Sequence, residues 1–166
     1  MKIIEFLTED HEKLRQDCLE IRKNLNPTTQ ETQKIFREKV KNYIAHFELH
    51  EAVEDLYLLK HLQTPSGPPA LKQLLEDYEK GHKKIWESLN ALIQQTHHRN
   101  SKTLQADFFN FVALIECHTS CEERLYFPIF KQHIDEKTLE HLGEKCKKYY
   151  ERYSGSKQED PKRGGL

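Results

Sequence analysis

The sequence is poor in the two residues that most often interrupt helices. Its 166 residues include only six glycines and six prolines, whereas these two types together make up about 12% of an average globular protein. An all-β sandwich or barrel needs frequent tight turns, and this chain has too few turn residues to supply them. We therefore expect an all-α protein.

The sequence also lacks long apolar runs and an excess of charge of one sign. No segment approaches the roughly 20 apolar residues of a membrane helix, and Glu5 interrupts the apolar N-terminal segment, which argues against a signal peptide. The 26 basic and 27 acidic residues nearly cancel, so no broad positive field attracts nucleic acid or anionic lipid. We expect a cytoplasmic protein that binds neither nucleic acid nor membrane.

Cysteines are few and show no C-x-x-C pairing. The four are Cys18, Cys117, Cys121 and Cys146. Without a secretory signal, such a set does not indicate a disulfide framework. We expect free thiols, with either a redox role or simple packing for Cys117 and Cys121, which flank a histidine discussed below.

Apolar residues recur at alternating steps of three and four along the segments 4–25, 36–57, 71–92 and 104–129, the pattern of packed helices. Breaks at Pro27, 64–69 and 97–101 separate these segments, and Pro128 should kink or end the fourth helix. Short connections favour an antiparallel up-down-up-down four-helix bundle over 1–132. A short additional C-terminal helix over 133–153 could cover the bundle or form a dimer contact, and 154–166 should be disordered.

Ionisable residues interrupt each apolar stripe near its middle. Burying an unpaired carboxylate or imidazole is costly, so such groups must pair with one another or share a cation. Histidine and glutamate four residues apart lie one turn apart on the same helix face. Nitrogen and oxygen donors of this kind favour iron, manganese or zinc over Cu(I), and the set suits two ions bridged by the glutamates. In chain order the six residues are His11, His50, Glu54, His82, His118 and Glu122.

The order of these residues repeats. A single histidine is followed by His-x-x-x-Glu in the first half of the chain and again in the second half, at nearly equal offsets. This repetition indicates two copies of one helical hairpin related by a pseudo-twofold axis.

The motifs Asp10-His11, His50-x-x-x-Glu54, Gly81-His82 and His118-x-x-x-Glu122-Glu123-x-Leu-Tyr-Phe-Pro128 closely resemble the hemerythrin-like HHE cation-binding domain. The resemblance covers about residues 3–131. It implies a four-helix bundle with a carboxylate-bridged and oxo- or hydroxo-bridged non-haem di-iron centre, iron being favoured over manganese or zinc. The ligands that it implies are His11, His50, Glu54, His82, His118 and Glu122.

Two departures from hemerythrin itself bear on function. Hemerythrin has a further histidine one turn before the third-helix ligand, where this chain has Tyr78, and its last motif is His-x-x-x-x-Asp in place of His118-x-x-x-Glu122. Either difference weakens the inference to reversible oxygen carriage. The pattern is closer to the branch that includes iron-centre repair proteins and an iron- and oxygen-sensing domain.

The expected function is that of a metal-binding protein that binds or senses dioxygen, nitric oxide or peroxide. The alternatives are a di-iron enzyme of nitrosative or oxidative stress (nitric oxide or peroxide reduction, or iron-centre repair) and a metal-buffering regulatory module. We expect a monomer or a weak homodimer.

Several neighbours of the predicted ligands have open roles. Tyr78 is a core residue, a hydrogen-bond donor to a ligand or itself a ligand, and His46 should lie at the rim of the site. Glu51 and Glu123 each follow a ligand and either orient an imidazole or carry surface charge. Gly81 is expected to let a neighbouring helix approach beside His82.

Overall fold

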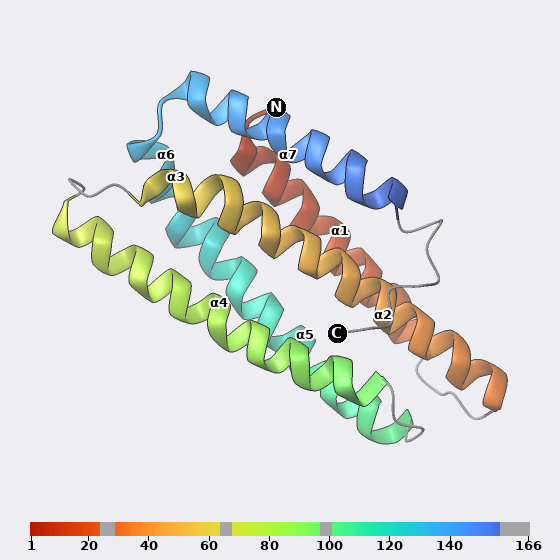
Figure 1. The fold of residues 1–166 in the computed structure, drawn as a ribbon. Helices are drawn as coiled ribbons and strands as arrows, with labels where there is room; N and C mark the ends of the chain where they lie inside the picture. The colour runs from red at the N-terminus through yellow and green to blue at the C-terminus, as the bar shows by residue number, and fades with distance from the viewer. Residues whose placement is uncertain (24–28, 64–67, 97–100, 157–166) are drawn as a thin grey trace.

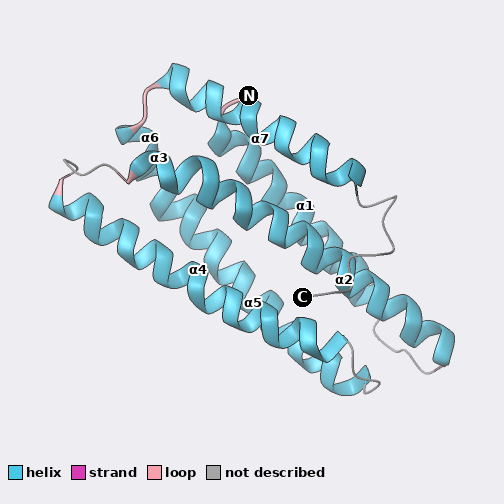
Figure 2. Cartoon of the chain, in the orientation of Figure 1, coloured by secondary structure: helices cyan, strands magenta, loops and turns pink. Residues whose placement is uncertain are grey.

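A computed structural model describes residues 1–23, 29–63, 68–96 and 101–156. These residues are almost entirely helical and contain no strand (Figure 2). The predicted all-α fold is therefore confirmed. None of the helices in the described ranges combines the length and the apolar character that crossing a membrane requires.

Four long helices lie side by side with similarly directed axes (Figure 1). They are α1 (Ile3–Lys23), α2 (Gln30–Val53), α4 (Pro69–Thr96) and α5 (Ser101–Cys121). The main contacts join α1 to α2, α2 to α4 and α4 to α5. Of the predicted breaks, Pro27 and residues 64–67 and 97–100 fall outside the described ranges.

Two of the long helices change pitch partway along. The π-helical segment η1 (Glu54–Leu59) joins α2 to the short helix α3 (Lys60–Leu62), and η2 (Glu122–Tyr126) joins α5 to α6 (Phe127–His133). Pro128 was predicted to kink or end the fourth helix. It lies in the first turn of α6, directly after the π turn of η2, and the helical path continues past it to His133.

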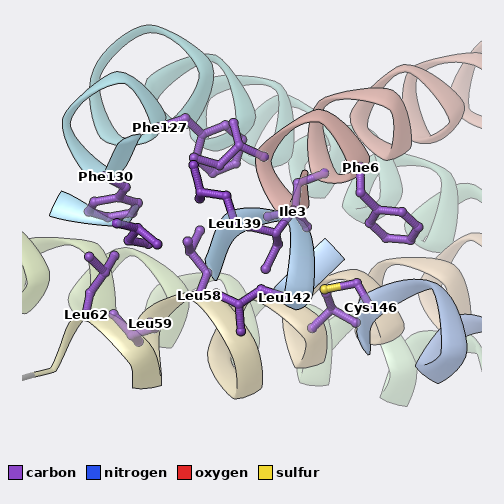
Figure 3. Packing of buried hydrophobic residues seen from close by; sticks show 14 of the residues in the cluster. Ile3, Phe6, Leu58, Leu59, Leu62, Phe127, Phe130, Leu139, Leu142 and Cys146 are labelled. Carbon is purple, nitrogen blue, oxygen red and sulfur yellow. The ribbon is translucent and has the colours of Figure 1, made fainter. Parts of the chain in front are cut away.

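The buried apolar side chains form two clusters, and the predicted ligands lie between them on all four helices. On α1, for example, Leu7 belongs to one cluster and Leu14 to the other, with His11 between. We call the first the α7-side cluster, after the C-terminal helix α7 (Glu136–Ser156) that it contacts, and it is drawn in Figure 3. It includes Ile3, Leu7, Leu58, Leu75, Phe127, Phe130 and Leu142. The second, the far cluster, includes Leu14, Ile21, Phe47, Ile85, Leu89, Phe108 and Phe111.

The C-terminal helix α7 (Glu136–Ser156) is not short. It has 21 residues, as many as α1, and lies against α1 (Figure 1). Leu139, Leu142 and Cys146 on its inner face are buried in the α7-side cluster (Figure 3), so α7 covers the bundle. Of the predicted disordered tail, residues 154–156 belong to α7, and 157–166 lie outside the described ranges.

Close backbone contact fixes the start of α7 against the N-terminus. A Cβ on Gly143 would lie 2.2 Å from the carbonyl oxygen of Met1 and 2.9 Å from the amide nitrogen of Ile3, so only glycine allows this approach. Asp135 caps α7 by accepting hydrogen bonds from the amide and hydroxyl of Thr138, at 3.0 and 2.6 Å.

Candidate metal centre

All six predicted ligands are buried at the boundary between the two apolar clusters. His118 is the most accessible at 9% exposure, and four of the six are completely inaccessible to solvent. The structure gathers them into two adjacent groups, each with atoms close enough together to hold one ion. We call these groups position A (His11, His50, Glu54 and Glu122) and position B (Glu51, Glu54, His82 and His118).

The residues of position A come from α1, α2, η1 and η2. The Nε2 atoms of His11 and His50 lie 3.0 Å apart. A carboxylate oxygen of Glu54 lies 3.4 Å from Nε2 of His50, and one of Glu122 lies 3.3 Å from Nε2 of His11. Two imidazole nitrogens and two carboxylate oxygens therefore converge on one point.

Position B lies directly beside position A because the same two glutamates reach both. The second oxygen of Glu54 lies 3.6 Å from Nε2 of His82. The second oxygen of Glu122 lies 2.9 Å from Nε2 of His118 and 3.7 Å from Nε2 of His82. Glu54 and Glu122 thus present one oxygen to each position, which is the arrangement of bridging carboxylates.

Each of these two glutamates is also the first residue of a π-helical segment. Glu54 begins η1 and Glu122 begins η2. Single π turns within α-helices are frequent at functional sites, and here the extra residue per turn follows the glutamate. Helical periodicity does not predict these π turns. The only related sequence signal is that the flanks Glu54-Asp-Leu-Tyr57 and Glu122-Glu-Arg-Leu-Tyr126 resemble each other.

Glu51 belongs to position B, which neither of its two predicted roles anticipated. Its side chain is fully buried. One oxygen lies 3.6 Å from Nε2 of His118 and the other 3.1 Å from Nδ1 of His82. Position B thereby acquires a carboxylate of its own, in addition to the two that it shares with position A.

Whether a metal ion fits this site can be judged from the hydrogen bonds of the atoms that would bind it. Among the described residues, seven buried side-chain nitrogen or oxygen atoms lack a hydrogen-bond partner, and every one belongs to this site. A buried polar group left unpaired costs about 1–3 kcal/mol, so this concentration is unfavourable unless a cation satisfies it. The atoms are both carboxylate oxygens of Glu51 and of Glu54, Oε2 of Glu122, and Nε2 of His82 and of His118.

The outer nitrogens of three histidines face carboxylates. Nδ1 of His11 donates to Glu123 at 2.8 Å, Nδ1 of His50 to Asp10 at 3.0 Å, and Nδ1 of His82 to Asp55 at 3.0 Å. Such a partner fixes the ring orientation and leaves Nε2 free to bind a metal. Glu123, which also accepts from Arg15 at 2.7 Å, therefore orients an imidazole, one of its two predicted roles.

Without a cation, protons on the histidines balance the buried carboxylates. Burial alone would lower the pKa of His82, but the hydrogen bond to Asp55, the contact with Glu122 and the nearby glutamate charges raise it to about 11. Burial is likewise outweighed at His118, whose pKa rises to about 9 through its contacts with Glu122 and Glu51. Metal uptake must displace such protons.

Tyr78 contacts one of the shared carboxylates. Its hydroxyl donates to Oε1 of Glu122 at 2.8 Å, and its ring centroid lies 4.3 Å from that of His82. Burial, followed by the charge of Glu122, raises the pKa of Tyr78 well above its usual value. The phenol is therefore protonated and acts as a donor to a ligand, one of the three predicted roles.

Other polar residues near the site point away from it. His46 lies at the rim, with its two ring nitrogens 3.1 Å from Asp10 and 3.0 Å from Asp17. Cys117 and Cys121 are exposed and therefore do not pack in the core, one of the two roles predicted for them. All four cysteines are free thiols.

Gly81 is not required by the packing beside the site. A Cβ on Gly81 would lie 3.8 Å from the ring of His118, which is an ordinary contact.

Comparison with known proteins agrees with this geometry. Residues 2–130 match the family model described as Hemerythrin HHE cation binding domain. Searches of curated proteins and of solved structures found no match. The matched region includes every residue of positions A and B and ends before α7. The match covers most of the chain, and the chain therefore belongs to the hemerythrin HHE cation-binding domain family.

Proposed function

We propose that this protein binds two iron ions at positions A and B and uses them to bind or sense dioxygen, nitric oxide or peroxide. The observation that carries the proposal is the set of seven unpaired buried atoms, all facing the two adjacent positions. The proposal includes an up-down-up-down course for α1, α2, α4 and α5, the arrangement that short connections between the helices favour.

The donor set supports iron. Counting Glu51, four imidazoles and three carboxylates surround the two positions, and among the described residues neither position includes a thiolate. Such nitrogen and oxygen donors suit Fe, Mn or Zn, whereas Cu(I) prefers sulfur. Among these three, iron is the metal that the family resemblance favours, and bound iron would supply one-electron oxidation and an exchangeable coordination position.

The surroundings of the site favour a small, weakly polar ligand. The ring of Phe127 stacks on His11 with centroids 5.7 Å apart, and the ring of Phe47 stacks on His50 at 6.2 Å. These rings belong to the two apolar clusters, which exclude bulk water from both ends of the site.

One small cavity supports the same size limit. A pocket of about 10 Å³ lies beside His11 between α1 and α5, lined in part by Leu14, Val112 and Ile115. A space of this size holds about one water molecule. A cavity of this size beside His11 is consistent with a diatomic or peroxide ligand.

The first test is the metal content of protein purified without air from iron-supplemented cells. We expect two iron ions per chain. The variant Glu54→Gln should lose iron, because Glu54 faces both positions, whereas the exposed Glu38→Gln on the same helix should retain two ions. Zinc alone, no metal, or full iron content in Glu54→Gln would contradict the proposal.

A second measurement separates binding from turnover. Exposing the reduced iron protein to air should produce visible absorption bands that disappear again when oxygen is removed. Irreversible bleaching would argue against reversible binding. Steady consumption of nitric oxide or peroxide with an electron donor would instead identify the alternative, a di-iron enzyme.

A further inference from the structure

Asp10 differs from the other carboxylates that hold the histidines of the centre. The side chains of Glu123 and Asp55 are 28% and 44% exposed, so water can solvate them, whereas that of Asp10 is 1% exposed. A carboxylate without water must receive its hydrogen bonds from protein groups. Asp10 therefore depends on the donors that surround it.

Asp10 has three such donors. Nδ1 of His50 donates to Oδ2 at 3.0 Å, Nε2 of His46 donates to Oδ1 at 3.1 Å, and the hydroxyl of Tyr150 donates to Oδ2 at 2.5 Å. Burial alone would raise the pKa of Asp10, but the hydrogen bonds from His46 and His50 hold it well below its usual range. The carboxylate is therefore ionised and saturated with donors.

Tyr150 comes from outside the part of the chain that the family match covers. The match ends at residue 130, and Tyr150 lies on α7. Its ring packs edge-on against Phe6 of α1, with centroids 4.9 Å apart and planes at 84°. Phe6 of α1 and Cys146 of α7 both belong to the α7-side cluster (Figure 3). The hydroxyl is thus held in place by the docking of α7 on the bundle.

We propose that Tyr150, on α7, is a positioning residue for the metal centre. Its hydrogen bond fixes the carboxylate of Asp10, and Asp10 in turn orients His50 by accepting from Nδ1. The inference rests on the proposed function, since it concerns the affinity of position A for a metal ion. Loss of an outer partner of a ligating histidine lowers metal affinity about 10- to 100-fold. Tyr150 acts one bond further out, so we expect a loss of about tenfold, the lower end of that range.

The effect should be confined to one of the two positions. The Tyr150–Asp10–His50 connection ends at position A, whereas His82 in position B is held by Asp55, next to Glu54 on η1. A general loosening of the fold would instead weaken both positions. This difference separates a positioning role from a merely structural one.

The test is to titrate metal-free protein with Fe(II) under nitrogen and to measure the heat of binding by calorimetry. Wild-type protein should bind two ions, and Tyr150→Phe should bind one of them about tenfold more weakly with the other unchanged. The matched control is Tyr149→Phe, because Tyr149 neighbours Tyr150 on α7 but its ring contacts Tyr57 and Tyr153. In an Asp10→Asn background, adding Tyr150→Phe should cause no further loss.

The possible outcomes are distinct. If wild-type protein binds fewer than two ions, the proposed function fails and this inference fails with it. If wild-type protein binds two ions and Tyr150→Phe binds both with wild-type affinity, only the inference fails. It also fails if both affinities fall together with the thermal midpoint of the metal-free protein, because that result indicates a purely structural role.

Discussion

Replacing Gly143 with alanine tests how tightly α7 is fixed to the N-terminus. The added Cβ would lie 2.2 Å from the Met1 carbonyl oxygen and within 3 Å of two further backbone atoms of residues 2 and 3. Because these atoms belong to backbone, no side-chain rotation relieves the contact. Either α7 moves outward, or the first three residues leave its surface.

The expected loss of folding free energy is set by whichever of these two rearrangements costs less. Overpacking of a tight contact costs about 1–3 kcal/mol. Releasing the N-terminus would expose Ile3, now fully buried, and losing the burial of one such side chain costs about 1.5–3 kcal/mol. Alanine in a helix recovers up to about 1 kcal/mol relative to glycine. The net loss is therefore about 1 kcal/mol, which corresponds to a fall in Tm of about 2–4 °C in a chain of this size.

The assay is thermal unfolding followed by circular dichroism on metal-free protein, with Gly81→Ala as the matched control. Gly81 is also inside a helix, but its Cβ would meet the His118 ring at an ordinary 3.8 Å. That variant should gain up to about 1 kcal/mol from helix propensity and melt at or above the wild-type temperature. A Gly143→Ala protein as stable as Gly81→Ala would refute the argument.

Three further predictions concern the centre. Glu51→Gln should lower the iron content toward one ion per chain, because Glu51 faces position B alone; two tightly bound ions by elemental analysis would show that Glu51 is not a ligand. The metal-free protein should lose stability as pH rises from about 6.5 through about 9, because the pKa of His118 is raised to about 9 in the folded chain and its stabilising proton leaves over that interval; urea midpoints that stay level or rise would contradict this. Tyr78→Phe should keep both ions but shift the absorption bands of the iron protein, since Glu122 loses its 2.8 Å donor; an unchanged spectrum would argue against this contact.

The helices and the buried face of each were predictable because helical periodicity is a local property of the chain. Histidines and glutamates that continue an apolar stripe must point inward with it, so the position of His11 or Glu122 could be read without any tertiary contact. The family followed from the same residues and is confirmed over residues 2–130.

The role of Glu51 could not be read in this way. It follows His50 directly and lies off the apolar stripe of its helix, so periodicity alone assigns it to the edge of the buried face. It is buried because α2 packs against α4 as well as α1. The width of a buried face depends on how many neighbours a helix has, and that number is a tertiary property.

The local sequence by itself therefore determined an all-helical chain with four histidines and two glutamates that point inward, because side-chain direction along a helix depends only on position. The tertiary structure decided which donor atoms share a position, because distances across the bundle depend on helix register and on the π turns at Glu54 and Glu122. It also decided that Tyr150 reaches Asp10. That hydrogen bond joins residues 140 positions apart, and it requires α7 to pack against α1.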